Sequence, residues 1–209
     1  MQIDHVCKNV DNYSGQYCLS IKNLPYLFLM DEKFNNRYLV PATRLSGWDY
    51  GSNGLYYVTI CTKNRVHYFG DVINEPNSAV ALKMTPIGEV ASKNWANIPI
   101  HHPFIELDEF VLMPNHLHGI IFINKPDKVD WQVNKFGVQS QNLASAMRGY
   151  KASVKTYATI NEIDFAWQPR YFDRVIRNEK EYQNVRAYIF NNMTDWLAKG
   201  DNEDNYFPM

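Results

Sequence analysis

The sequence predicts an α+β fold in which an antiparallel sheet of the ferredoxin-like type carries helices on one face. The periodic segments run in the order strand, helix, strand, strand, helix, strand, helix. Pro114-Asn115 separates two of the strands, and this dipeptide is a turn signal that predicts a hairpin. Of the 209 residues 45% are hydrophobic and 21% are charged, which is enough apolar material for the core of one domain.

The chain divides by composition into three parts. Residues 1–40 show no clear period and are predicted to be an N-terminal extension, residues 41–200 the folded domain, and residues 201–209 an acidic tail. No apolar run approaches the roughly 20 residues that a bilayer span needs. The three cysteines show no CxxC spacing, which is typical of a reducing compartment. We therefore expect a cytoplasmic protein with no membrane partner.

The first half of the predicted domain supplies three strands and a helix. Residues 55–62 (LYYVTICT) are β-branched and aromatic, as in a strand. Residues 79–96 carry a helical stripe that contains Pro86, which predicts a short segment followed by a helix with Pro in its first turn. Residues 103–113, interrupted by acids, and residues 116–123 (HLHGIIFI) are predicted as the strands of the hairpin.

The second half is predicted to contain two helices and a strand. Residues 125–141 are polar and are expected to form a loop. Residues 142–160 place apolar side chains at helical spacing, residues 171–176 (YFDRVI) form a short strand candidate, and residues 179–196 have the pattern of a final helix. The last strand and the last helix therefore follow each other directly.

His116 and His118 form the strongest chemical signal. Side chains at positions i and i+2 of a strand point to the same face, about 6.6 Å apart along the backbone, so two imidazoles can converge on one metal ion. Gly119 removes bulk beside the pair. A bare HxH is also typical of a surface pair, or of histidines that satisfy each other, and this alternative stays open from spacing alone.

Tyr188 and Asn192 form a second signal on the last helix. Their spacing of four residues places them one turn apart on the same helix face, so a phenol and an amide could lie beside a metal. The alternative is an amphipathic core tyrosine with an asparagine near the end of the helix. Spacing does not decide between these interpretations.

Two segments together resemble a known family. FVLMPNHLHGIIFI (residues 110–123) is followed by WQPRYFDRVIRNEKEYQNVRAYIFNN (residues 167–192), and LSGWDYGSNGLYYVTICTKNR (residues 45–65) lies upstream. In this order they resemble the REP-associated tyrosine transposase family, which are single-tyrosine HUH nucleases related to small insertion-sequence transposases. The resemblance covers about residues 40–196, and residues 1–40 fall outside it.

The resemblance assigns roles to particular residues. It implies that His116 and His118 are the family's metal-binding histidine pair, that Tyr188 is the nucleophile, and that Asn192 helps to hold the metal. Tyr150 and Tyr157 are competing tyrosines, but they lie on the preceding helix without a partner on the metal side. The implied fold is an HUH variant of the ferredoxin-like sheet, in agreement with the order of elements.

The activity implied by the resemblance is phosphoryl transfer on single-stranded or hairpin DNA. A divalent cation, Mg²⁺ or Mn²⁺, would act as a Lewis acid on the scissile phosphate, and Tyr188 would attack to leave a 5′-phosphotyrosine link and a free 3′-hydroxyl. Tyr188 needs activation because an ordinary phenol has a pKa of about 10. Some relatives work as monomers and others place the tyrosine helix in a partner's site, so a monomer and a homodimer are both expected.

One stretch of the chain has the charge that a nucleic acid requires. The net charge is −1, but residues 142–188 hold eight Lys and Arg against five Asp and Glu. Basic side chains in this stretch suit phosphates, and Trp167, Tyr171 and Phe172 between them could stack on bases. A solvated helix face with core aromatics is the alternative. The predicted nucleic-acid-binding residues are Arg148, Lys151, Lys155, Arg170, Arg174 and Arg177.

Two other functions are compatible with the same residues. A domesticated transposase can keep the fold and the DNA-binding face yet lose turnover, which would leave a DNA-binding protein. A small zinc hydrolase could use the histidine pair, but it would need a third strong ligand, and neither an HExxH motif nor a cysteine pair supports it.

Overall fold

The computed structural model describes residues 48–76, 78–126 and 141–199, all of which belong to one compact unit. The predicted N-terminal extension (residues 1–40), the acidic tail (residues 201–209) and nearly all of the predicted loop at residues 125–141 lie outside the described residues. The description that follows concerns the folded domain alone.

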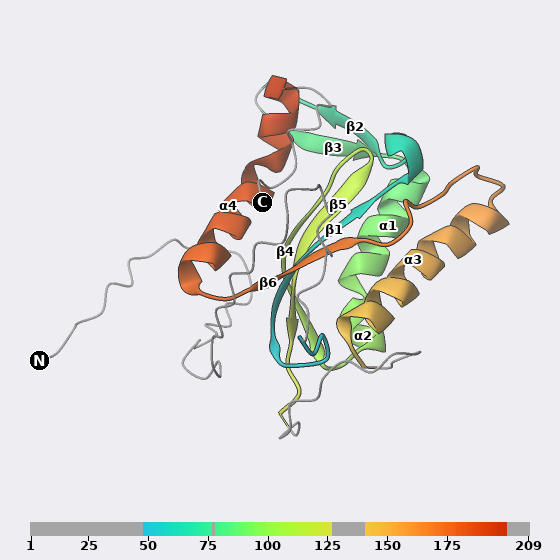
Figure 1. Cartoon of the computed structure of the whole chain (residues 1–209). Coiled ribbons are helices and arrows are strands. Elements are labelled where there is room, and N and C mark those ends of the chain that lie inside the picture. Colours follow the sequence, from blue (N-terminus) through green and yellow to red (C-terminus); the bar gives the residue numbers. More distant parts are fainter. Residues whose placement is uncertain (1–47, 77, 127–140, 200–209) are drawn as a thin grey trace, which may run out of the picture. The chain divides into compact units, whose positions relative to one another are not determined.

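The centre of this domain is a four-stranded sheet in which every neighbouring pair is antiparallel (Figure 1). Its strands are β1 (Gly54–Cys61), β4 (Ile105–Leu112), β5 (His116–Ile123) and β6 (Phe172–Ile176), arranged in the order β4-β5-β1-β6. Strands that are joined through a helix are separated in the sheet by one other strand. This is the topology of the ferredoxin-like fold, so the predicted α+β class is confirmed.

Helices cover both faces of the sheet. Helices α1 (Pro86–Ala96) and α3 (Leu143–Ile160) lie on one face, as Figure 1 shows, and α4 (Glu179–Lys199) crosses the opposite face. The prediction of helices on one face therefore describes α1 and α3. The other face is partly covered by the last helix of the same chain.

The helix starts follow from local sequence. Asn142 caps α3, since its side chain accepts a hydrogen bond from the Ser145 amide while the Ser145 hydroxyl side chain returns a bond to the Asn142 backbone. Thr85 caps α1 in a similar way, accepting from the Gly88 amide, and Pro86 occupies the first helical position, as predicted. Both helices therefore begin where the sequence signals them.

Four short elements were not predicted. Strands β2 (Gly70–Ile73) and β3 (Ala81–Met84) pair as a separate antiparallel ribbon. A 3₁₀ turn (Lys63–Arg65) follows β1, and the single-turn helix α2 (Ile98–His101) follows α1. Elements of three or four residues are too short to establish a period, so sequence patterning does not reveal them.

The alternation of β1 and β5 divides the core in two. Side chains such as Tyr56, Val58 and Leu117 pack with α1 and α3, whereas Tyr57 and Ile120 pack with α4. The histidines of β5 share the α4 side because they alternate with Leu117 and Gly119.

No helix among the described residues combines the length and the apolar character that crossing a membrane requires.

Candidate active site

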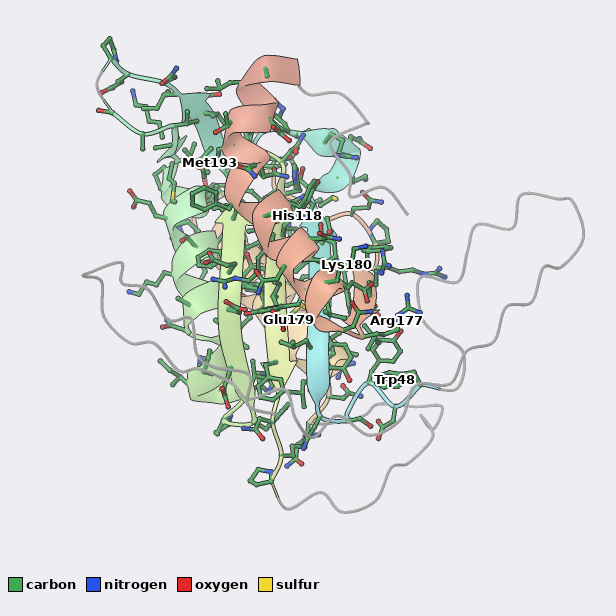
Figure 2. All side chains as sticks on the ribbon, turned by 90° about the vertical axis from the view of Figure 1, so that its left-hand side faces the viewer. Trp48, His118, Arg177, Glu179, Lys180 and Met193 are labelled. Carbon is green, nitrogen blue, oxygen red and sulfur yellow. The ribbon has the colours of Figure 1, made fainter. Side chains whose placement is uncertain are left out.

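The candidate site lies between β5 and α4. Figure 2 looks onto the face of the sheet that α4 crosses, and His118 is labelled beside the middle of this helix. Strand pairing places Thr59 opposite His118 and Cys61 opposite His116, so the β1 side chains on this face flank the histidine pair. Both histidines are covered: His116 is 1% exposed and His118 is 0% exposed.

His118 is held at one ring nitrogen by hydroxyl groups of β1. Its Nδ1 lies 2.7 Å from the Tyr57 hydroxyl and 2.8 Å from Oγ1 of Thr59. Burial, and to a smaller extent the nearby Arg65 cation, together lower the pKa of His118 to about 3. The imidazole is therefore neutral at physiological pH, which is the form that binds metals.

His116 is held by the residue that precedes it. Its Nδ1 lies 2.6 Å from Oδ1 of Asn115, which is itself fully buried in the turn between β4 and β5. The rings of His116 and His118 lie 4.6 Å apart between centroids, at an interplanar angle of 71°. The two imidazoles are thus adjacent, as expected for alternate positions on one strand.

Tyr188 reaches the histidine pair from α4 of the same chain. Its hydroxyl lies 3.3 Å from Nε2 of His118, and the two ring centroids lie 5.2 Å apart. The Tyr57 ring meets Tyr188 edge-on at 6.5 Å. The structure therefore brings together the predicted nucleophile and one of the two predicted metal-binding histidines within a single chain.

Asn192 lies on the same stripe of α4 as Tyr188. Tyr188 contacts His118, and Trp196 lies 5.9 Å from the His116 ring, so Asn192 is placed one turn from each of these contacts. Its side chain is 3% exposed, and its Oδ1 has no hydrogen-bond partner among the residues that the structure describes. A buried amide oxygen in this position could serve as a ligand to a cation, which would then supply the interaction that the oxygen lacks.

The donor set at this site fits a divalent cation that keeps open positions. Within the described ranges, no group of three or more His, Cys, Asp or Glu side chains is placed to hold a metal. A cation here would be held by the imidazoles of His116 and His118 and by the amide oxygen of Asn192, which leaves positions for phosphate or water oxygens. Such a mixed set suits Mg²⁺ or Mn²⁺ better than a closed structural zinc site.

Two of the predicted DNA-binding lysines support the chain that follows α3. Lys151 Nζ donates to the backbone oxygens of Gln168 and Arg170, at 2.7 Å each, and Lys155 Nζ donates to that of Phe165 at 2.6 Å. Burial lowers the pKa of Lys151. These contacts give both lysines a structural role, and their contact with DNA stays a prediction.

The predicted arginines fall into two groups. Arg174 and Arg177 both pair with Glu181 of α4, at 2.6 and 3.5 Å, beside the start of that helix. Arg148 and Arg170 are exposed on α3 and on the segment before β6. Arg174 is also on the α4 side of the sheet, opposite Tyr57 in the strand pairing. Arg174 and Arg177 therefore lie at the β6 edge of the site, whereas Arg148 lies on the helix that covers the opposite face, and the role of all four in binding DNA stays a prediction.

The competing tyrosines and Trp167 pack on the side of the sheet that α1 and α3 cover. Tyr150 is 3% exposed and packs against Trp95 on the α1 side of the sheet, and burial raises the pKa of its hydroxyl far above the ordinary value. Tyr157 packs at the edge of the same core. Trp167 contacts Phe165 and donates to the Lys151 carbonyl, so it belongs to the core rather than to an open surface.

Sequence reasoning missed the residues that hold the histidine rings. Tyr57 and Thr59 contact Nδ1 of His118, and Asn115 contacts Nδ1 of His116. The sequence pattern identifies these three residues only as members of a strand or a turn. The alternation of β1 could have placed Tyr57 and Thr59 on one face. Their position opposite His118 depends on strand register, which a single sequence does not reveal.

The sequence of this chain is similar to that of a known bacterial protein. A protein of Haemophilus influenzae (strain Rd), described only as uncharacterized, is 39% identical over 165 residues, which cover 74% of this chain and 88% of the relative. The chain belongs to the family of this protein. No family model matches the sequence.

Two further similarities concern REP-associated tyrosine transposases. A second H. influenzae protein, named "Putative REP-associated tyrosine transposase", is 24% identical over 150 residues, covering 69% of this chain and 72% of that protein. A solved structure of a REP-associated tyrosine transposase bound to a REP hairpin is 18% identical to this chain. It aligns with a TM-score of 0.48, over 85% of this chain and 93% of that one.

Proposed function

We propose that this protein is a metal-dependent DNA nuclease and strand transferase that acts on single-stranded or hairpin DNA through Tyr188. The observation that carries the proposal is the 3.3 Å approach of the Tyr188 hydroxyl to Nε2 of His118, beside a second histidine and a buried amide oxygen. The relative named as a REP-associated tyrosine transposase, although only 24% identical, supports the same chemistry.

The residues of this chain divide the reaction between them. His116, His118 and Asn192 would hold the divalent cation, which when bound polarises the scissile phosphate as a Lewis acid. Tyr188 loses its proton to water and its oxygen forms a bond to phosphorus. The bond from phosphorus to the 3′ oxygen breaks, and that oxygen takes up a proton to become a 3′-hydroxyl. The 5′-phosphotyrosine link that remains can be attacked by another 3′-hydroxyl to rejoin a strand.

Access to this site requires a movement of α4. The two imidazoles are covered almost completely, and apolar residues of α4, Val185 and Ile189, pack on the same sheet face. A phosphate therefore reaches the ring nitrogens when the helix shifts along or away from the sheet. The Tyr188 oxygen, which lies beside Nε2 in the structure, would move off that nitrogen in the same step.

The decisive experiment is incubation with labelled hairpin oligonucleotides and Mn²⁺, followed by a denaturing gel that detects protein-linked DNA. We expect an adduct with the native protein, no adduct with Tyr188→Phe, and retained hairpin binding by that variant. Tyr182→Phe is the matched control, since Tyr182 lies on the same helix but contacts Asp108. An undiminished adduct in Tyr188→Phe would remove this tyrosine from the role, and full cleavage in chelator would remove the metal.

A DNA-binding protein of the same fold that has lost turnover is the second candidate. The neutral Asn192, together with the lack of a third His, Cys, Asp or Glu ligand among the described residues, makes the proposed metal site a weak one and favours this alternative. It predicts a gel shift with hairpin DNA and no cleavage with Mg²⁺, Mn²⁺ or Ni²⁺. An adduct with any of these ions would exclude it.

A further inference from the structure

We propose that Asn115, and the hydroxyl pair of Tyr57 and Thr59, are positioning residues that fix the tautomers of the two histidines. Each group lies at the Nδ1 atom of one ring, so that the proton is kept on Nδ1 and the lone pair on Nε2. The inference rests on the proposed function in one respect, which is that the Nε2 atoms are the ones that face a metal.

For His116 the direction of the hydrogen bond follows from Asn115. The Asn115 amide nitrogen lies 3.2 Å from the carbonyl oxygen of Arg65, to which it donates, and this fixes which way the amide is turned. The opposite orientation would place two acceptor oxygens face to face. Oδ1 therefore faces Nδ1 of His116 at 2.6 Å, and because an amide oxygen only accepts, Nδ1 must carry the proton.

A neutral imidazole has one N–H, so the lone pair of His116 lies on Nε2. This is the arrangement found at metal sites, where a ligating histidine donates its other N–H to an acceptor of the protein. Asn115 also accepts hydrogen bonds through its backbone oxygen, from the amide and the hydroxyl of Thr62. The turn between β4 and β5 is thereby tied to the end of β1, which keeps the acceptor still.

For His118 the acceptor is supplied by β1. Thr59 is its partner in the strand register, and Tyr57 lies two residues away on the same face. Their oxygens lie 2.8 and 2.7 Å from Nδ1, close enough to accept from a ring N–H. Nε2, on the other side of the ring, lies 3.3 Å from the Tyr188 hydroxyl and is left to accept from it or to bind a cation. Both rings are thus anchored at the same atom, by different elements.

The direct test is the tautomer of each histidine in the metal-free protein. Long-range ¹⁵N–¹H correlation spectra distinguish a protonated Nδ1 from a protonated Nε2. We expect Nδ1–H at both His116 and His118, and a proton on Nε2 of either ring would overturn the inference. This measurement needs neither DNA cleavage nor metal binding, so it gives a result even if the adduct experiment fails.

The second test measures metal affinity without activity. Titration of Mn²⁺ followed by electron paramagnetic resonance should show binding weakened about 10- to 100-fold by Asn115→Leu, and by Thr59→Val combined with Tyr57→Phe. Asn115→Asp keeps an acceptor oxygen at Nδ1 of His116 but loses the donor to the Arg65 carbonyl, and it should restore part of the affinity. Asn124→Leu makes the same substitution beyond the far end of β5, where the amide donates to Glu106, and should leave the affinity unchanged.

Specific outcomes would contradict the positioning role. Native affinity in Asn115→Leu, or an Asn115→Asp variant as weak as Asn115→Leu, would reduce Asn115 to a structural residue of the turn. If Asn115→Leu does not fold, the variant of Thr59 and Tyr57 decides, because valine and phenylalanine keep the shapes of the residues they replace. Native Mn²⁺ affinity in that variant would overturn the inference for His118.

Discussion

The hydroxyl of Tyr188 lies 3.3 Å from Nε2 of His118 within a single chain. With the lone pair of His118 on Nε2, the phenol donates to the same nitrogen that would bind a metal ion, so the tyrosine and a cation compete for one atom. The described structure is therefore the closed form of the site, with α4 on the sheet. In the proposed reaction the helix moves, and the tyrosine then approaches a phosphate instead of the imidazole.

The buried amide oxygen of Asn192, which has no hydrogen-bond partner among the described residues, should cost stability in the metal-free protein. A buried polar group without a partner costs about 1–3 kcal/mol, and replacing it by an apolar group of similar size removes that cost. We expect Asn192→Leu to raise the free energy of unfolding in chelator by about 1 kcal/mol, as measured by urea denaturation, and to weaken Mn²⁺ binding. Opposite changes in stability and metal affinity would indicate a group kept for binding.

Asn191→Leu is the matched control for this substitution. Asn191 is the exposed neighbour on α4, and its side chain donates to the Ala187 carbonyl. Its replacement should change neither the unfolding free energy by more than a few tenths of a kcal/mol nor the metal affinity. A loss of stability in Asn192→Leu would show that the amide is satisfied and would remove it as a candidate ligand.

The sequence contains enough information to predict the sheet and the two pairs of site residues, His116 with His118 and Tyr188 with Asn192. The strand at residues 116–123 was predicted with the bounds that the structure shows. The Pro-Asn turn marks where the strand starts, and the alternation of its residues indicates which side chains share a face of the sheet. The same alternation placed His116 and His118 on one face, and helical spacing placed Tyr188 and Asn192 on another. Local patterns of this kind need no knowledge of partners.

The remaining features depend on contacts between distant segments. That Tyr188 meets His118 depends on α4 crossing the sheet face opposite α1 and α3, which no periodicity encodes. The position of Thr59 beside His118 depends on register between β1 and β5. Lys151 and Lys155, which were predicted to bind nucleic acid from the charge of their stretch, donate to backbone carbonyls, because the chain after α3 folds back along that helix.

Gly119 should be essential for packing on the side of the sheet that faces away from the histidines. A Cβ atom at this position would lie 2.4 Å from Cζ2 of Trp95, whose fully buried ring cannot withdraw. We expect Gly119→Ala to lower the free energy of unfolding by about 1–3 kcal/mol, as for other overpacked cores. Chemical denaturation followed by tryptophan fluorescence measures this change.

Gly149→Ala provides the contrasting substitution. Gly149 is exposed on α3, and the nearest atom to an added Cβ is Nε2 of His102 at an ordinary 3.7 Å. Alanine favours a helix over glycine by about 1 kcal/mol, so this variant should be more stable than the native protein. Equal effects of the two glycine substitutions would show that the Trp95 contact is not tight.

Tyr182 should make stability depend on alkaline pH. Burial, followed by its hydrogen bond to Asp108, raises the pKa of Tyr182 to about 12 from the ordinary 10. Between pH 10 and 12 the unfolded chain loses this proton while the folded protein keeps it, so the free energy of unfolding falls as the pH rises through that window. Tyr182→Phe lacks the group and should lose stability less steeply. Parallel curves for the two proteins over this range would contradict the shift.

Arg186 should hold α4 in its closed position on β4. Its Nη2 lies 2.8 Å from Oε1 of Glu109 and its Nε lies 3.8 Å from Oδ1 of Asp108, while its guanidinium lies over the Tyr182 ring at 5.6 Å. The two acids reach the helix from the point where the pairing of β4 with β5 shifts register, a bulge that redirects their side chains.

Arg186→Ala should therefore loosen the helix more than it destabilises the fold. The side chains of Arg186 and Glu109 are 38% and 40% exposed and that of Asp108 is 27% exposed, so solvent screens the pairs and the loss of unfolding free energy should be about 1 kcal/mol or less. Hydrogen exchange of the α4 amides should accelerate, while exchange in β1 and β5 stays slow, because only the helix loses its anchor. Lys180→Ala removes an exposed cation from the first turn of α4 and serves as the control. Uniform acceleration across helix and sheet would mean that α4 opens only when the whole domain unfolds, which would contradict the movement that the proposed reaction needs.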